Sequence, residues 1–159
     1  MKTIFMKSRF CLIQCLILLV AVMISAPVLA DKPNCNDKGG QNILVHLQTT
    51  DLPAAKIASK LSLLLQNEGC DTVMFLSSNG VQVANEKVFP SKSAINQLLT
   101  NFLGEGGKIF LCPGCAESAT PNFSKKGDDY GALLSGAEIL TSEDQVTEMF
   151  VNADKIADF

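Results

Sequence analysis

Two cysteines three residues apart stand directly behind an apolar run. The motif Cys112-Pro113-Gly114-Cys115 follows Lys108–Leu111, a run typical of a buried β-strand. A cysteine at the end of such a strand lies at the carboxyl edge of a sheet, where open α/β sheets hold their sites. Backbone N–H groups at a helix start lower the pKa of a cysteine and favour the reactive thiolate. The pattern therefore predicts sulfur chemistry, with Cys112 as nucleophile and Cys115 as its partner.

Three other interpretations of this motif remain. A zinc site needs two further ligands, and the chain has one histidine, so we expect no metal and no cofactor. A thioredoxin-type site is disfavoured because the motif follows the third predicted strand instead of opening the domain. The third interpretation is an inert bridge between Cys112 and Cys115 that stiffens a loop.

The first 30 residues have the organisation of a secretory signal peptide. Three basic residues precede an apolar run over 10–24, and Val28-Leu29-Ala30 carries small residues where a signal peptidase reads them. We expect cleavage after Ala30 and export, to the periplasm if the source is a Gram-negative bacterium. The alternative is an uncleaved anchor, because the apolar stretch approaches the roughly 20 residues that span a bilayer. The membrane would then be a partner only through this segment.

The remaining 129 residues have the size and charge of one acidic domain. Residues 31–159 carry ten lysines and no arginine against 16 acidic side chains. Phosphate recognition relies heavily on arginine, so a nucleic-acid partner is not expected. The length suits one compact domain with its own core. We assign 31–41 to a polar leader and 42–159 to the domain.

Hydrophobic periodicity in the domain alternates between strand-like and helix-like segments. The predicted strands cover 43–47, 72–76, 108–111, 137–140 and 155–159, and the predicted helices cover 54–65, 91–103 and 143–150. Residues 81–83 are expected to add a short extended piece. Alternation of this kind predicts right-handed βαβ units. The expected fold is α/β, a three-layer sandwich with a mainly parallel five-stranded sheet flanked by helices.

Each predicted helix carries apolar residues at helical spacing that we expect to face the core. In the first helix they are Ala54, Ile57, Ala58, Leu61, Leu64 and Leu65, with Lys56 and Lys60 on the outer face. In the second they are Ile95, Leu98, Leu99, Phe102 and Leu103, and in the third Val146, Met149 and Phe150.

Cys35 and Cys70 are the other two cysteines outside the predicted signal peptide. Cys70 precedes the second strand and Cys35 precedes the first, so both enter the sheet from its amino-end face. A structural disulfide between them would pin the leader to the domain, in a compartment that permits disulfides. The alternative is that Cys70 is a buried free thiol and Cys35 is unpaired.

His46 ends the first predicted strand, at the same carboxyl edge as Cys112, and can act as a base for the thiol. The competing interpretation is a packed histidine whose ring N–H is satisfied by a neighbour. Ser77-Ser78-Asn79 ends the second strand near the same edge. Its hydroxyl groups can bind a ligand, and ordinary turn chemistry explains them equally well.

The order and spacing of several segments resemble the DsrE/DsrF-like sulfur-relay family, especially its YchN-like branch. The resemblance covers essentially the whole of 42–159. The segments that carry it are Ile43-Leu44-Val45, the helix over 54–65, Glu68–Leu76, Lys108–Cys115 and Asn152–Phe159.

The resemblance implies a small α/β sandwich that assembles into a homo-oligomer, a trimer or a hexamer. In the sulfur-carrying members, a cysteine after the third long strand accepts a persulfide sulfur and passes it on, and Cys112 matches that position. The export signal and the leader with Cys35 depart from the cytosolic relay proteins, so a role in tRNA thiolation is not carried over.

Three functions follow as expectations. The first is an exported sulfur carrier that relays a persulfide through Cys112 between a donor and an acceptor, at most sulfurtransferase-like as an enzyme. The second is a thiol–disulfide redox protein that uses Cys112 and Cys115 with a redox partner protein. The third is a non-catalytic oligomeric binding module.

Overall fold

The computed structural model describes Cys35, residues 40–119, Phe123 and residues 132–159. These residues belong to the compact unit Pro33–Phe159. The predicted signal peptide and most of the polar leader lie outside the described residues. No helix among the residues described is both long and apolar enough to span a bilayer.

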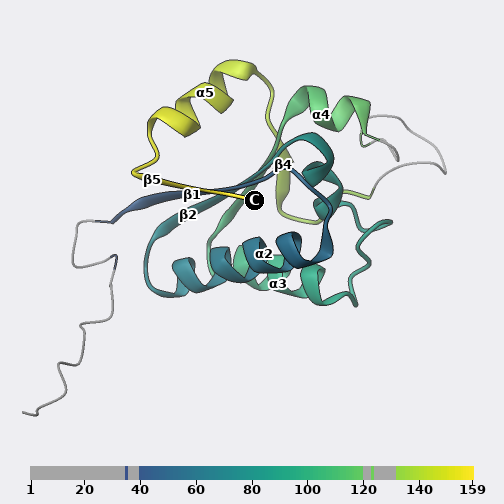
Figure 1. Cartoon of the computed structure of the whole chain (residues 1–159), viewed down its shortest axis with the longest axis horizontal. Coiled ribbons are helices and arrows are strands. Elements are labelled where there is room, and N and C mark those ends of the chain that lie inside the picture. The colour runs from purple at the N-terminus through teal and green to yellow at the C-terminus, as the bar shows by residue number, and fades with distance from the viewer. Residues whose placement is uncertain (1–34, 36–39, 120–122, 124–131) are drawn as a thin grey trace, which may run out of the picture. The chain divides into compact units, whose positions relative to one another are not determined.

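Five parallel strands form one sheet, which confirms the predicted α/β class (Figure 1). The strands are β1 (Asn42–Leu47), β2 (Asp71–Leu76), β3 (Lys108–Leu111), β4 (Ala137–Ile139) and β5 (Lys155–Asp158). Their spatial order is β4-β3-β2-β1-β5, and every neighbouring pair is parallel. All five strands therefore end at one edge of the sheet, and that edge carries the cysteine motif.

Helices cover both faces of the sheet. Figure 1 shows α2 (Leu52–Asn67) and α3 (Ala94–Gly104) on one face and α5 (Glu143–Val151) on the other. Asp51 caps α2, with Pro53 in the first turn, and Ser93 and Ser142 cap α3 and α5 through their hydroxyl groups. The short helix α4 (Pro113–Ser118) follows β3 directly.

The main core lies between the sheet and the pair α2 and α3. Alternate strand residues such as Val45, Leu47, Met74, Leu76 and Leu111 point into it and are essentially inaccessible to solvent. On the other face, α5 has no fully buried residue, and Val146, Met149 and Phe150 are only half-buried. These three residues lie on the predicted inner side of α5, where they remain partly accessible to solvent.

Two sequence-based expectations about local structure are wrong. Residues 81–83 are not extended; they belong to a buried 3₁₀ helix, η2 (Ser78–Ala84). The core-facing residues of α2 are mainly small, because this helix buries Ala55, Ala58, Ser59 and Ser62. Ile57 and Leu64 remain exposed. The Ser59 and Ser62 hydroxyl groups donate to backbone carbonyls one turn earlier, so burying them leaves no unsatisfied donor.

Cys35 and Cys70 form a disulfide, the pairing that the positions of their segments suggested. Their Cα atoms are 4.9 Å apart, and both side chains are buried beside Ile43 and Leu65. The bond joins the chain before β1 to the junction between α2 and β2, at the amino ends of the strands and away from the cysteine motif.

Candidate functional site

The cysteine motif stands where β3 meets α4. Cys112 is the N-cap residue of α4, and Pro113 occupies the first turn, a position that proline favours. The Cys112 N–H donates to the Leu76 carbonyl at 2.9 Å, which holds the first cysteine beside the end of β2. Cys112 therefore lies at the end of a strand and the start of a helix, as expected.

The two thiols are in direct contact. The Sγ atoms of Cys112 and Cys115 are 2.6 Å apart, farther than the roughly 2.05 Å of a disulfide. Both cysteines are free and half-buried. A small side-chain movement would join them, so the pair can exist as a dithiol or as a disulfide.

The pKa of the Cys112 thiol is raised above its ordinary value, contrary to the expectation of a favoured thiolate. Burial is the largest cause, and the shared hydrogen bond with the Cys115 thiol is the next. The backbone N–H groups of Gly114 and Cys115 lower the pKa, as expected at a helix start, but they are outweighed.

Cys115 is the thiol that borders open space. It lines a cavity of about 350 Å³ together with Ser78, Asn79, Gln82 and Ser118. The Ser78 N–H donates to Cys115 Sγ at 3.2 Å and holds this sulfur beside the start of η2. The described residues of the cavity wall supply hydroxyl and amide groups and no charged side chain. The space suits a small ligand that approaches the sulfur pair.

His46 lies at the carboxyl edge, as its place at the end of β1 predicted, but its ring contacts other partners. Nδ1 is 2.7 Å from Asp158 Oδ1, and Nε2 is 2.8 Å from Ser77 Oγ. Among the residues that the structure describes, no hydrogen bond joins His46 to a cysteine. Its suggested role as a base for Cys112 stays a prediction.

Asp158 is the residue at this edge that sequence reasoning missed. It ends β5, and β5 pairs with β1 so that Asp158 lies in register with His46. The signal available in the sequence was its position near the end of the last predicted strand. That signal became specific only once β5 was known to lie beside β1.

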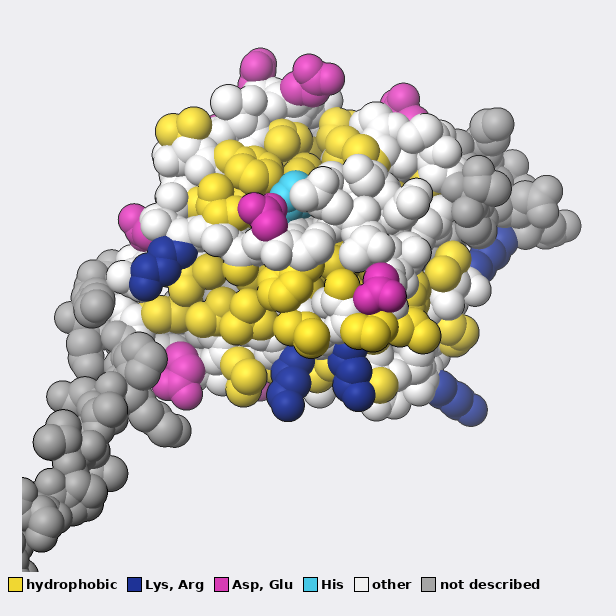
Figure 2. Space-filling model, in the orientation of Figure 1, with side chains coloured by type: hydrophobic (Ala, Val, Ile, Leu, Met, Phe, Trp, Pro, Cys, Tyr) yellow, Lys and Arg dark blue, Asp and Glu magenta, His cyan; other side chains and the backbone are white. Residues whose placement is uncertain are grey.

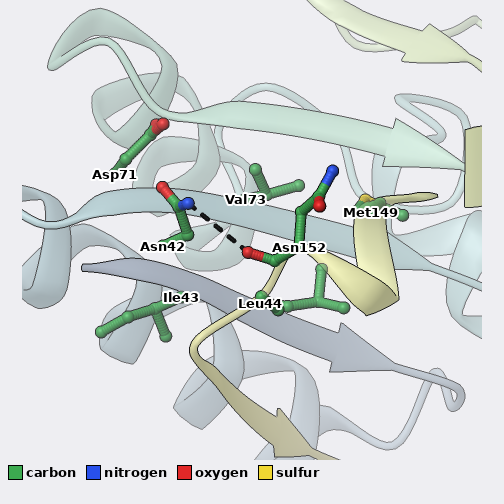
Figure 3. A pocket seen from close by; sticks show the side chains of 8 residues that line it. Asn42, Ile43, Leu44, Asp71, Val73, Met149 and Asn152 are labelled. Atoms are coloured by element: carbon green, nitrogen blue, oxygen red, sulfur yellow. Dashed lines mark hydrogen bonds between the residues drawn. The ribbon is translucent and has the colours of Figure 1, made fainter. Parts of the chain in front are cut away.

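A second cavity lies at the opposite edge of the sheet (Figure 3). Its volume is about 190 Å³, and Figure 3 shows Val73, Met149 and Leu44 beside Asn42, whose amide donates to the Asn152 carbonyl at 3.4 Å. Among the residues with described positions, no thiol or histidine lines this space. Nor do three potential metal ligands cluster anywhere in the described part of the chain. The cysteine edge is therefore the better candidate for chemistry.

Comparison with solved structures finds chains of similar structure. The crystal structure of the YchN protein from E. coli matches with a TM-score of 0.61 and 18% identity, over 76% of this chain and 99% of that one. A conserved protein of unknown function from Bacteroides thetaiotaomicron matches with a TM-score of 0.48 and 18% identity, over 81% and 100% of the two chains. No family model and no curated protein matches the sequence. At this identity the likeness to YchN shows the fold alone.

Proposed function

We propose that this chain is an exported DsrE-like protein whose Cys112–Cys115 pair takes up sulfane sulfur and releases it. The contact between two free thiols, 2.6 Å apart at the carboxyl edge, is the observation that carries the proposal. The cavity beside Cys115 gives a small donor access. The fold shared with YchN agrees with the resemblance of the sequence to the DsrE/DsrF-like proteins.

The reaction takes two exchanges at sulfur. The Cys112 thiolate attacks the outer sulfur of a donor such as thiosulfate, the donor S–S bond breaks, and sulfite leaves with the electron pair. Cys112 then holds a persulfide, which can be passed to an acceptor. Without an acceptor, the Cys115 thiolate attacks Cys112 Sγ, sulfide leaves, and a Cys112–Cys115 disulfide forms. A partner dithiol restores the two thiols and is itself oxidised.

Mass spectrometry of the reduced protein after incubation with thiosulfate tests this sequence. Cys115→Ser should accumulate the mass of one added sulfur atom on Cys112, because the resolving thiol is missing. The unchanged chain should release sulfide and end as the disulfide. Cys112→Ser should do neither.

Ser118→Ala is the matched control, because Ser118 borders the same cavity and, within the part of the chain that the structure describes, its hydroxyl contacts only backbone carbonyls. This variant should behave like the unchanged chain. A Cys115→Ser protein that gains no sulfur, while its Cys112 thiol remains titratable, would refute sulfur uptake at this site.

A second candidate is thiol–disulfide exchange with a redox partner protein. The contact between the two sulfurs favours it, because little side-chain movement separates the dithiol from the disulfide. Equilibration with glutathione should then give a reduction potential between about −120 and −270 mV, the range of catalytic pairs. A potential below about −300 mV would assign the pair a structural role.

The proposed location is outside the cytoplasm, in the periplasm of a Gram-negative source. It follows from the signal-peptide organisation of residues 1–30. The formation of a Cys35–Cys70 disulfide agrees with an oxidising compartment. Cell fractionation followed by N-terminal sequencing should find a mature chain that begins at Asp31. A chain that retains Met1 in the membrane fraction would favour the uncleaved anchor.

A further inference from the structure

The only histidine of the chain lies at the centre of a hydrogen-bonded row of three side chains. Asp158 Oδ1 contacts His46 Nδ1 at 2.7 Å, and His46 Nε2 contacts Ser77 Oγ at 2.8 Å. Serine, histidine and aspartate in this order are the groups of an activated serine nucleophile. The proposed sulfur chemistry uses none of them.

The fold fixes this row through the parallel sheet. Asp158 and His46 are register partners on β5 and β1, and Ser77 is the first residue after β2. The Ser77 N–H donates to the Leu47 carbonyl, and the Phe159 N–H donates to the His46 carbonyl. Three adjacent strand ends therefore hold the three side chains at one edge.

Aromatic neighbours set the orientation of the imidazole. The Phe75 ring stacks on His46 with a centroid distance of 5.3 Å, and the Phe150 ring meets it edge-on at 5.4 Å. The His46 side chain is only 12% exposed, whereas that of Asp158 is 63% exposed. The ring is held in a small apolar slot with its two nitrogens directed at polar partners.

The partners also determine where the ring proton lies. An ionised carboxylate only accepts, so Nδ1 carries the proton and donates to Asp158. In the neutral ring, Nε2 is then an acceptor, and the Ser77 hydroxyl donates to it. This is the tautomer that removes a proton from a serine hydroxyl during nucleophilic attack.

A tight turn follows Ser77 and keeps it at the edge. Ser78 has a φ of +48°, which non-glycine residues seldom adopt. A Cβ on Gly80 would approach the Leu47 carbonyl oxygen to 2.2 Å, so only glycine fits there. In some α/β enzymes a nucleophilic serine sits on a sharp strand-to-helix turn. Here the residue with positive φ is Ser78, and the backbone of Ser77 is extended. Ser77 is half-buried here and thus accessible in part.

We propose that Ser77 is an activated nucleophile that accepts acyl groups from small esters, with His46 as base and Asp158 as the positioning residue. Ser77 Oγ attacks the ester carbonyl carbon while its proton passes to His46 Nε2. The carbon–oxygen bond to the alcohol breaks, and the alcohol leaves with that proton. Water then releases the acid by the same route. The Ser78 N–H, which could stabilise the oxyanion, is directed at Cys115, so turnover is slow.

A fluorophosphonate probe, which phosphonylates activated serines and releases fluoride, tests the proposal on the purified chain. Peptide mapping by mass spectrometry should place the label on Ser77. His46→Gln keeps a hydrogen-bonding amide but no base, and should slow labelling about 100-fold. Asp158→Asn should slow it by at least a similar factor, because an amide can donate to Nδ1 and leave the ring proton on Nε2, where it blocks the base.

Ser135→Ala is the matched control, because Ser135 is an exposed serine that belongs neither to the row nor to the cavity beside Cys115. This variant should be labelled like the unchanged chain, and circular dichroism should show every variant folded. The absence of label on Ser77 in the unchanged chain overturns the proposal. Labelling at an unchanged rate in folded His46→Gln also overturns it and leaves the row a structural tie between strand ends.

Discussion

At the scale of single residues, the Cys112 thiol is subject to opposed influences. Backbone N–H groups of α4 stabilise its thiolate, whereas burial and the adjacent Cys115 thiol favour the protonated form. The net result is a raised pKa, and hence a smaller thiolate fraction at neutral pH than in an unperturbed cysteine. Reaction at Cys112 therefore speeds up only as the pH rises toward this pKa.

Replacing Cys115 by alanine should shift that pH dependence downward. Cys115→Ala removes the hydrogen bond and the charge interaction that raise the pKa of Cys112, while the backbone N–H groups remain. The rate of iodoacetamide alkylation at Cys112, followed by peptide mass spectrometry across pH, should reach half-maximum at a lower pH. Ser118→Ala should leave the profile unchanged. A midpoint that stays in place or rises in Cys115→Ala would contradict this assignment of causes.

Gly80 allows the close approach of η2 to the end of β1. Gly80→Ala should destabilise the fold by about 2–3 kcal/mol, because the new Cβ meets the Leu47 carbonyl oxygen, which is fixed by backbone pairing. Gly104→Ala is the control, since its Cβ would meet nothing within 4 Å at the end of α3. That change should stabilise by about 0.4–1 kcal/mol. Urea unfolding measures both, and equal effects would contradict the steric explanation.

At the scale of elements, α2 has two different apolar surfaces. It buries Ala55, Ala58, Ser59 and Ser62, whose small side chains let neighbouring elements approach closely. Its larger apolar residues, Ile57 and Leu64, lie seven positions apart and share another side of the helix. An apolar pattern at helical spacing therefore indicated a helix correctly, but it did not indicate which side meets the sheet.

The Cys35–Cys70 disulfide links the leader to the α2–β2 junction, and removing it should weaken the whole domain. The two cysteines are 35 positions apart. A disulfide that closes a loop of this length reduces the entropy of the unfolded chain. The native state is thereby stabilised by about 3–4 kcal/mol relative to the unfolded state. Urea unfolding of the Cys35→Ala/Cys70→Ala variant should show a loss of this order. Reduction of the disulfide in the unchanged protein should lower the free energy of unfolding by a comparable amount. A free energy of unfolding that neither the substitution nor the reduction lowers would contradict a structural role.

At the scale of the whole molecule, the exposed apolar side of α2 supports the expected homo-oligomer. Ile57 is 57% exposed and Leu64 is 50% exposed, and half-buried Leu61 lies between them on the same side of the helix. Figure 2 shows hydrophobic side chains gathered in a band on the face that carries α2. We propose that a second copy of the chain covers this band.

Charges placed in the band should separate the copies. Ile57→Lys combined with Leu64→Lys would bury two ammonium groups at the contact, so light scattering should report a monomer for this variant. The unchanged chain should behave as a trimer or hexamer. Val151→Lys is the control, because Val151 is exposed on α5, outside the band. A monomeric unchanged chain at micromolar concentration would contradict the proposal.

The sequence alone determined the α/β class and the position of the cysteine motif. Both depend on local patterns, because helix and strand periodicity and the βαβ rule are encoded in neighbouring residues. The parallel arrangement then required Cys112, Ser77 and His46 to stand at one edge. The strand ends of Leu76 and Leu111 meet there as expected.

Only the tertiary structure decided which side chains meet at that edge. Asp158 reaches His46 because β5 lies beside β1, and these residues are 112 positions apart. The raised pKa of Cys112 depends on burial and on Cys115, which packing sets and spacing does not. Strand order and close packing arise from contacts between segments that are distant in the sequence. A local sequence pattern does not specify those contacts.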